Sequence, residues 1–386
     1  MIYFGIDILL KQNPLWKKER LALVTNQSAT TCHYVYSRKA LLDAGFNIVK
    51  LFSPEHGLDI KGTDGAKMKD GIDVLTHLPV ISLYNEKLAP EESDLQDIDI
   101  VLFDIPDIGC RFYTYLWTMT HVLQTCAAYR KKCIILDRPN PLSGDLNLSE
   151  GPLLDETSCA SFIGRGTLPL RHSCTLGELA LYFNTIKNIR ADTTVIRCEQ
   201  WDRNSFQPDW GMQFIPTSPA MNNFQSALLY PGLGLLEAAN ISEGRGTDKP
   251  FCIIGAPWLQ TGLIVNTLNN ASVNAKEITF TPTESKYTHE TCYSIEFQVT
   301  EPAQFHSLQN GLLLIKLIKD THPDYFQWKP YPTNVNPSGN NHLNKLLGIP
   351  QSELLFDLPM HTFTAQIHSL TDNHQWQQLI HPYLLY

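Results

Sequence analysis

The sequence lacks most of the short motifs that identify a cofactor, a metal or an activated nucleophile. No Gly-x-Gly-x-x-Gly follows a predicted strand and no Gly-x-x-x-x-Gly-Lys-Ser/Thr occurs, which argues against dinucleotide and P-loop sites. His-Glu-x-x-His and Cys-x-x-Cys are also absent, so zinc proteases and structural zinc sites are disfavoured. Ser53 does not stand in the Gly-x-Ser-x-Gly of an α/β-hydrolase. We therefore expect no cofactor and no metal.

Positive charge and long apolar runs are lacking as well. The net charge is -9, with 18% charged residues, whereas a nucleic-acid-binding protein needs a basic face. The first twenty residues, MIYFGIDILLKQNPLWKKER, contain no basic start, long apolar stretch or cleavage site. No segment is apolar enough to span a membrane. The sequence therefore predicts a cytoplasmic protein that acts on a small molecule and binds neither nucleic acid nor membrane.

Cysteine is present, but its number and spacing do not form a disulfide framework. There are nine cysteines, an odd number, and several stand inside apolar runs such as 132–135 and 251–254. Such residues are typical of small, reduced core side chains in a reducing compartment.

The 386 residues and 43% hydrophobic content are enough for two domains with real cores. In the first half, apolar runs alternate with helical patterns, which predicts parallel strands joined by helices. Strands are predicted at 21–25, 48–52, 98–103 and 132–136, and helices at 34–44 and 115–128. Continuous Val, Ile, Leu and Phe runs are typical of strands buried on both faces. The fold class is therefore α/β, with a Rossmann-like N-terminal domain over 1–190.

The second half has a different character. Thr175 and Glu178 predict a capping box at the start of a helix. A strand is predicted at 195–198, followed by Pro- and Gly-rich loops, an alternating stretch at 293–299 and a helix at 305–318. This pattern indicates a smaller α+β domain over 191–386 that completes a cleft.

A polar residue follows each of the first four predicted strands. These residues are Asn26, Glu55, Asp104 and Asp137. In open α/β sheets ligands bind outside the carboxyl ends of the strands, so we expect the four side chains to line one crevice.

The segment Phe52-Ser53-Pro54-Glu55-His56-Gly57 raises a chemical question, because a turn needs only the proline and the glycine. A glycosidase requires a carboxylic acid of raised pKa, together with a second group acting as base or nucleophile. Glu55 beside apolar Phe52 and Pro54 is suited to the first role, and His56 to tuning it or binding substrate. These residues alone predict an α/β enzyme with a polar crevice, a hydrolase being one possibility.

Other polar residues gather in a few loops. Arginine can hold a carboxylate through two parallel hydrogen bonds, and aromatic faces stack on sugars. Further candidates for substrate contact therefore stand in segments 104–115, 137–144, 164–172 and 242–248: Arg111, Tyr113, Arg138, Asn140, Arg165, Arg171, His172, Glu243, Arg245 and Asp248. A local ion pair between Asp107 and Arg111 is the alternative reading of the first segment.

Longer motifs, taken together, resemble one family. They are LVTNQSA, LFSPEHG, FDIPDIGCRFYTY, LDRPNPLSG, SFIGRGTLPLRH, TLGELA, LYPGLGLLEAANISEGRGTDKPF, IGAPW and PYLLY. In order and content they are similar to the exo-β-N-acetylmuramidases of the NamZ type, formerly a domain of unknown function. The resemblance runs from about Leu21 to Tyr386. Pro106 and Cys110 depart from it, because the family usually has Gln and Ala there.

The resemblance implies a glycoside hydrolase that releases N-acetylmuramic acid from non-reducing ends of peptidoglycan fragments. It implies Glu55 as general acid/base, with Asp104 or Glu243 positioning it, a water or the acetamido group. For the lactyl carboxylate of the sugar it leaves four candidates, Arg111, Arg138, Arg171 and Arg245, and for the ring or acetamido group Tyr113 and Asn222.

Two alternatives stay open at this stage. One is a related hexosaminidase, which would not need the arginines. The other is a non-catalytic protein that binds amino sugars or peptidoglycan fragments. Since family members often carry an export signal and none is seen here, we expect an imported muropeptide as substrate, as in cell-wall recycling.

Overall fold

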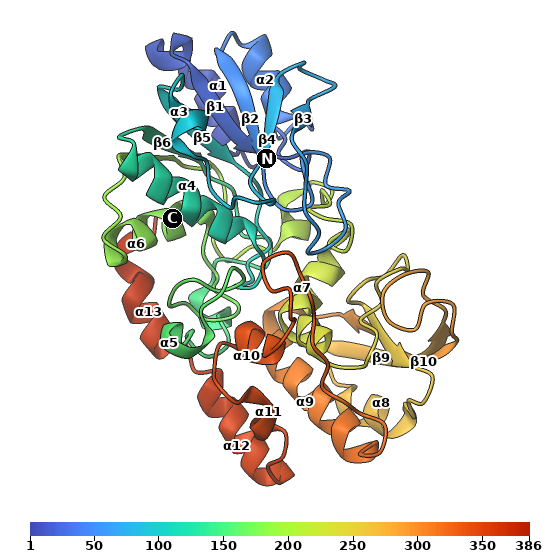
Figure 1. Cartoon of the computed structure of the whole chain (residues 1–386). Coiled ribbons are helices and arrows are strands. Elements are labelled where there is room, and N and C mark those ends of the chain that lie inside the picture. Colours follow the sequence, from blue (N-terminus) through green and yellow to red (C-terminus); the bar gives the residue numbers. More distant parts are fainter.

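The computed structural model describes residues 1–386, which form two lobes, one above the other in Figure 1. The upper lobe is built on a seven-stranded sheet with the order β3-β4-β2-β1-β5-β6-β7. Its strands are β1 (Leu21–Thr25), β2 (Ile48–Ser53), β3 (Gly71–Ile72), β4 (Pro79–Ser82), β5 (Ile100–Asp104), β6 (Lys132–Leu136) and β7 (Thr193–Ile196). Only the short edge strand β3 is antiparallel to its neighbour.

Without β3, the strands follow the chain order 3-2-1-4-5-6 of a Rossmann-like sheet, which confirms the predicted fold class. Residues of β1 alternate between two cores: Leu21 and Leu23 face one, Ala22 and Val24 the other. The helices of this lobe are α1 (Gly5–Gln12), α2 (Ser37–Asp43), α3 (Glu92–Leu95), α4 (Tyr115–Ala128) and α6 (Leu176–Ile186), whereas the short α5 (Glu156–Cys159) lies below them in Figure 1, at the level of the lower lobe. The predicted capping box is present, with Thr175 Oγ1 accepting from the Glu178 N–H.

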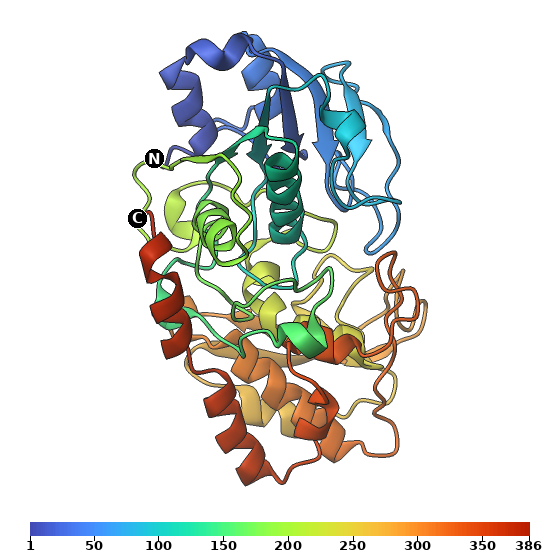
Figure 2. The same ribbon diagram turned by 60° about the vertical axis from the view of Figure 1, so that its left-hand side comes forward.

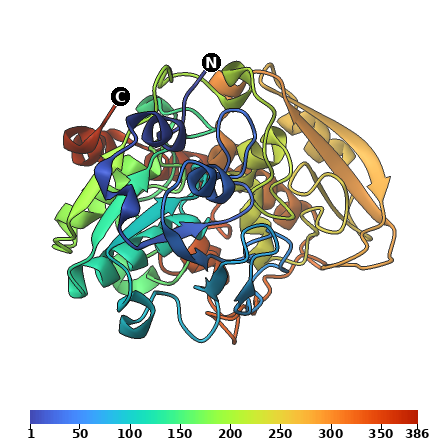
Figure 3. The same ribbon diagram turned by 90° about the horizontal axis from the view of Figure 1, so that it is seen from above.

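The lower lobe holds an antiparallel sheet of order β8-β10-β9, visible at the right of Figure 3. Its strands and helices are α7 (Phe224–Leu233), β8 (Ile253–Ala256), α8 (Gly262–Leu268), β9 (Val273–Phe280), β10 (Cys292–Val299), α9 (Ser307–Thr321), α10 (His342–Leu347), α11 (Ser352–Leu355), α12 (Met360–Leu370) and α13 (His374–Ile380). None of the helices combines the length and apolar character needed to cross a lipid bilayer.

The two lobes are not independent bodies. The larger hydrophobic core includes Phe103 and Trp117 of the upper lobe together with Leu312 and Phe356 of the lower one. The chain also returns to the upper lobe at its end, where Trp376 donates to the backbone carbonyl of His172. The parallel sheet continues into β7, past the domain boundary predicted at residue 190. That boundary stays a prediction.

Two loops meet at the junction of the lobes. The loop that follows β2 and the loop 331–341 lie side by side in Figures 1 and 2. The Asn334 N–H donates to the carbonyl of Gly65 at 2.7 Å, and the Asn334 side chain donates to the carbonyl of Asn85. These contacts cover the carboxyl end of β2 and enclose the side chains that follow it.

Candidate active site

The turn after β2 holds Glu55 and His56 in a constrained backbone. The Gly57 N–H donates to the Pro54 carbonyl, and His56 and Gly57 have φ angles of 65° and 73°. A positive φ is uncommon for a residue other than glycine, and such residues gather at functional sites. His56 Nδ1 lies 2.8 Å from the Gly62 carbonyl oxygen, which fixes the ring. The turn thus presents two buried polar side chains next to each other.

These side chains open into a cavity between the lobes. Its accessible volume is about 50 Å³, and residues of both lobes line it. The upper lobe contributes Glu55, His56, Asp64, Tyr84, Phe112, Tyr113, Thr114 and Ile163; the lower lobe and the segment before it contribute Ser218, Ala220, Met221, Tyr230, Glu237, Arg245, Phe251, Tyr331, Thr333, Val335, His342 and Leu346. The cavity therefore combines aromatic walls with a concentrated set of charges.

Glu55 is only 4% exposed, and its surroundings favour the protonated acid. Burial is the main cause that raises its pKa, and the negative charge of Asp64 raises it further. His56, the Thr114 hydroxyl and the Gly65 N–H oppose the shift, the last donating to Oε1 at 2.9 Å. The net pKa is above that of an ordinary glutamic acid.

Asp64 has the opposite character. Burial alone would raise its pKa, but Arg245, His56, the Tyr331 hydroxyl and His342 outweigh that effect and hold the pKa below its ordinary value. Tyr331 donates to Asp64 Oδ2 at 2.7 Å, and Arg245 Nη2 lies 3.6 Å from the same oxygen. Asp64 belongs to the upper lobe, yet three of these four partners, Arg245, Tyr331 and His342, come from the lower lobe.

Arg245 is the centre of a charge network behind Asp64. Its guanidinium contacts Glu237 Oε1 at 2.8 Å and Glu243 Oε1 at 3.3 Å, and Glu243 in turn contacts Lys286 Nζ at 2.9 Å. Arg245 therefore serves three carboxylates at once.

One oxygen of Glu55, one nitrogen of His56 and one oxygen of Asp64 lie within 4.8 Å of one another. Such a set has donor atoms suited to a divalent metal. However, Asp64 already pairs with the Arg245 guanidinium at 3.6 Å and accepts a hydrogen bond from the Tyr331 hydroxyl. The arrangement instead separates the pKa values of two neighbouring carboxylates, which is the pattern that defines an acid and its charged partner.

Known proteins share both the sequence and the fold. The family models described as exo-beta-N-acetylmuramidase NamZ match this chain over residues 21–225 for the N-terminal part and 228–386 for the C-terminal part. The chain belongs to this family. The peptidoglycan beta-N-acetylmuramidase NamZ of Bacillus subtilis is 38% identical over 332 residues, which are 84% of this chain and 79% of that protein.

Two crystal structures of DUF1343 family proteins from Bacteroides fragilis have the same architecture. One aligns with a TM-score of 0.87 at 26% identity and the other with 0.75 at 27% identity. Each alignment covers 100% of this chain and 99% of the solved one. The predicted resemblance to the NamZ family is thus confirmed, and with it the assignment to glycoside hydrolases.

Within this family member, four of the predicted site residues line the cavity: Glu55, His56, Tyr113 and Arg245. Glu243 stands behind Arg245, fully buried, and reaches the cavity only through that arginine. The Tyr113 hydroxyl donates a hydrogen bond to Thr217 Oγ1 at 2.7 Å. Tyr113 therefore lines the cavity, but its hydroxyl already has a partner.

Asp104 ends β5 but does not enter the cavity. Its carboxylate is fully buried and receives two hydrogen bonds from Arg138, Nε to Oδ1 at 2.6 Å and Nη2 to Oδ2 at 3.0 Å. Arg138 also donates to the Thr30 carbonyl. The expected convergence of all four strand-end residues on one crevice therefore does not occur, because this pair closes on itself.

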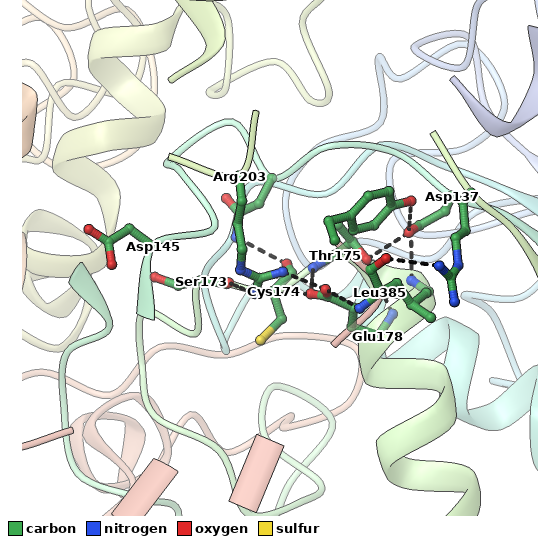
Figure 4. Close-up of polar contacts among 12 residues, drawn as sticks. Asp137, Asp145, Ser173, Cys174, Thr175, Glu178, Arg203 and Leu385 are labelled. Atoms are coloured by element: carbon green, nitrogen blue, oxygen red, sulfur yellow. Dashed lines mark hydrogen bonds and ion pairs between the residues drawn. The ribbon is translucent and has the colours of Figure 1, made fainter. Parts of the chain in front are cut away.

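Asp137 is likewise committed to the fold (Figure 4). It accepts from the Thr175 hydroxyl at 2.7 Å, from the Gly177 N–H at 2.8 Å and from the Tyr386 hydroxyl at 2.8 Å. Burial nevertheless raises its pKa to about 6. The residue connects β6, the start of α6 and the last residue of the chain.

Arg111 and Arg171 are buried in the interior. The terminal nitrogens of Arg111 donate to the carbonyls of Pro152, Leu168, Leu346 and Leu347, the last two at the end of α10. Arg171 donates to the Leu142 and Phe305 carbonyls and lies 3.8 Å from Glu150. Neither guanidinium lines the cavity, so the structure gives no reason to assign either arginine to the lactyl carboxylate.

The remaining predicted residues also lie outside the cavity. Asn26 accepts from Ser28, Asn140 donates to the Cys174 carbonyl, and Asn222 donates to the Asp248 carbonyl. His172 Nε2 lies 3.3 Å from Asp107 Oδ2, so Asp107 pairs with this histidine and not with Arg111. Arg165 lines a groove next to the cavity.

The sequence reasoning missed Asp64, Tyr84, Glu237, Tyr331 and His342. Asp64 had a usable signal, because it stands in a Thr-Asp-Gly turn shortly after the Glu55 segment. Tyr331 and His342 had none: they belong to a loop and a short helix distant in sequence, and only the fold brings them to Asp64.

Proposed function

We propose that this chain is an exo-acting glycoside hydrolase that releases N-acetylmuramic acid from the non-reducing ends of peptidoglycan fragments, with Glu55 as its general acid. Family membership and the Bacillus subtilis relative support the reaction. The observation that carries the residue assignment is the pair of carboxylates in the cavity between the two lobes, Glu55 with a raised pKa and Asp64 with a lowered one.

Protonated Glu55 donates its proton to the glycosidic oxygen as the bond to the anomeric carbon breaks. A buried acid of raised pKa keeps its proton to higher pH than an exposed glutamic acid does, which favours general acid catalysis. Water then adds its hydroxyl to the anomeric carbon, and its remaining proton returns to Glu55. Tyr84, whose pKa is raised by burial and by the charge of Glu55, keeps its proton and can hydrogen-bond to the Glu55 carboxylate that results.

Asp64 supplies the second charge. Its carboxylate stabilises the positive charge that develops at the anomeric carbon, while Arg245 and Tyr331 hold it ionised. Carboxyl groups about 5–5.5 Å apart are typical of retaining glycosidases, and inverting ones need about 6.5–9.5 Å to admit a water. One oxygen of Glu55 and one oxygen of Asp64 lie no more than 4.8 Å apart, which favours the shorter of these two separations. We therefore predict retention, visible by proton NMR as the β anomer of the sugar forming first.

The test is hydrolysis of a β-glycoside of N-acetylmuramic acid whose leaving group is a sugar alcohol, beside the matching N-acetylglucosaminide. We expect the wild type to cleave the muramide and Glu55→Gln to lose that turnover while remaining folded. Equal cleavage of both glycosides would indicate a broader hexosaminidase. Tight binding without turnover of synthetic and natural substrates alike would indicate a sugar-binding protein. Turnover that survives Glu55→Gln would disprove the role of this residue.

The cytoplasmic location and the recycling of imported fragments stay predictions. All nine cysteines are buried and unpaired, which is compatible with a reducing compartment. Cell fractionation would test the location directly.

A further inference from the structure

The proposed substrate carries a carboxylate, and the cavity itself offers no uncommitted cation for it. Arg245 is the arginine of the cavity, and it already contacts Asp64, Glu237 and Glu243. A further carboxylate beside it would meet three like charges. The cation that recognises the substrate must therefore stand next to the cavity.

A groove adjoins the cavity and shares Thr333 and Val335 with it. Its walls include Lys67, His121, Phe162 and Arg165. The short turn 161–164 joins the two spaces, because its Ile163 lines the cavity while Phe162 lines the groove.

The turn 161–164 also brings the groove close to the general acid. The Phe162 ring lies 5.4 Å from the ring of Tyr84 and 5.9 Å from that of His121, measured between centroids. Tyr84 hydrogen-bonds Glu55, and His121 is a neighbour of Arg165. Phe162 therefore lies between a ring of the cavity wall, Tyr84, and a ring beside Arg165, His121.

Arg165 is prepared to bind an anion. Its Nη1 donates to Thr120 Oγ1 at 2.8 Å and its Nη2 to Gln124 Oε1 at 3.0 Å, and both acceptors are uncharged side chains of α4. No carboxylate lies within ion-pair distance, and burial alone lowers its pKa. The two hydrogen bonds fix the guanidinium without neutralising it. By contrast, Lys67 in the same groove is already paired with Glu86.

His121 carries no charge that would add to that of Arg165 or oppose it. Burial, helped by the nearby Arg165 charge, lowers the pKa of His121 to about 4, so the imidazole is neutral at physiological pH. Arg165 is therefore the fixed positive charge that faces this part of the groove.

We propose that Arg165 recognises a carboxylate of the substrate and so determines the preference for muramyl over glucosaminyl glycosides. This inference rests on the proposed function, and it replaces the four arginines that the sequence suggested for the task. The carboxylate belongs either to the lactyl group of N-acetylmuramic acid or to a stem peptide attached to it. Both sources present the same planar anion to the guanidinium.

The experiment compares the wild type and Arg165→Gln on two substrates that differ only in charge, as in a double-mutant cycle. One glycoside carries the free lactyl carboxylate, and the other is its neutral primary amide. Loss of a charge-assisted pair predicts a fall in kcat/KM of about 10- to 100-fold on the first substrate, mainly through KM. On the amide the same variant should match the wild type. Arg165→Lys should recover part of the loss. Arg190→Gln serves as the matched control without effect, because this exposed arginine also donates to an uncharged side chain, Asn188, but lines neither the cavity nor the groove.

A muramyl peptide, in which the lactyl carboxylate is consumed in an amide bond, separates the two sources. If Arg165→Gln affects the charged glycoside but not this substrate, the lactyl group is the partner; if it affects this substrate alone, a peptide carboxylate is. An equal loss on the charged glycoside and its amide would show a structural role and overturn the proposal, and so would no loss on any of the three substrates.

A binding measurement tests the carboxylate site independently of the proposed hydrolytic activity. Affinity of the Glu55→Gln variant for free N-acetylmuramic acid and for N-acetylglucosamine can be measured by calorimetry without turnover. Adding Arg165→Gln should weaken binding of the first sugar only. If the wild type hydrolyses no glycoside but this selective loss is seen, the activity fails and the carboxylate site stands. No difference between the sugars would overturn the site.

Discussion

The carboxyl ends of two neighbouring regions of the same sheet differ in the hydrogen-bond donors that reach their buried carboxylates. At the end of β2, Glu55 receives one backbone donor and faces a cavity, and burial leaves its pKa raised. At the ends of β5 and β6, Asp104 and Asp137 are buried as deeply, yet each is held by several side-chain or backbone donors. All three carboxylates stand at or just after the end of a strand, but they differ in the number of hydrogen-bond donors that reach them.

The difference shows which buried carboxylates are available for chemistry. A buried charge is costly unless it is paired and hydrogen-bonded, so a fully served carboxylate is a structural element. A carboxylate with few donors, placed beside a second and ionised one, keeps a proton that it can transfer. Glu55 with Asp64 meets this criterion, and Asp104 with Arg138 does not.

The comparison predicts its largest effect on activity at Glu55. Glu55→Gln should lower kcat/KM on a muramide with a poor leaving group by about 10²- to 10⁴-fold, because a positioned proton donor contributes about that much. Its denaturation midpoint should equal that of the wild type or exceed it, since a neutral amide replaces a group that burial disfavours when charged. Urea unfolding and steady-state kinetics on the same preparation measure both quantities.

Asp104→Asn should give the inverse result. The change leaves the buried Arg138 without its counter-charge, which typically costs about 3–5 kcal/mol in the free energy of unfolding. The protein that remains folded should keep its kcat, because this pair does not line the cavity. Asp99→Asn is the matched control at the other end of β5, where an exposed pair with Arg20 is worth about 1 kcal/mol or less. A normal stability with lost turnover would contradict the comparison.

Asp64→Asn should lower kcat by about 10²-fold, as removal of a preorganised charge does. It should also change the pH profile. In the wild type, activity falls at low pH as Asp64 is protonated and at high pH as Glu55 is ionised. The variant should lose the acid limb, and its alkaline limb should move to lower pH, because the charge of Asp64 helps to raise the pKa of Glu55.

The exposed Asp59 on the same loop supplies the control for that profile, and Asp59→Asn should leave both limbs in place. An alkaline limb that does not move in Asp64→Asn would contradict the coupling between the two carboxylates.

The smallest effect is expected from metal removal. Glu55, His56 and Asp64 are close enough to share a metal, but Asp64 already pairs with Arg245. Treatment with a chelator should therefore leave kcat/KM unchanged. Activity that is lost with the chelator and restored by a divalent cation would contradict the charge assignment of the cavity.

Much of the fold could be predicted because its signals are local. The strand at 21–25 and the helix at 115–128 match β1 and α4 residue for residue, since continuous apolar runs and flanking turns define them. Glu55 was predicted for a similar reason, standing in a short polar turn after a buried strand. The capping box at Thr175 is equally local.

The rest of the site depends on contacts that no local pattern encodes. Arg111 looks like a substrate anchor in sequence, yet it binds the end of α10 from more than two hundred residues away. Asp64 becomes the charged partner of Glu55 only because Arg245 and Tyr331 arrive from the other lobe. Composition can suggest which arginines are candidates, but only the folded chain shows which of them are already paired.

The most direct test of the central claim compares leaving groups. A general acid matters for a poor leaving group such as a sugar alcohol and hardly at all for dinitrophenolate, which departs without a proton. The account predicts that Glu55→Gln loses kcat/KM by orders of magnitude on a muramyl disaccharide but nearly matches the wild type on the dinitrophenyl muramide. Equal losses on the two substrates would contradict the assignment of Glu55 as the proton donor.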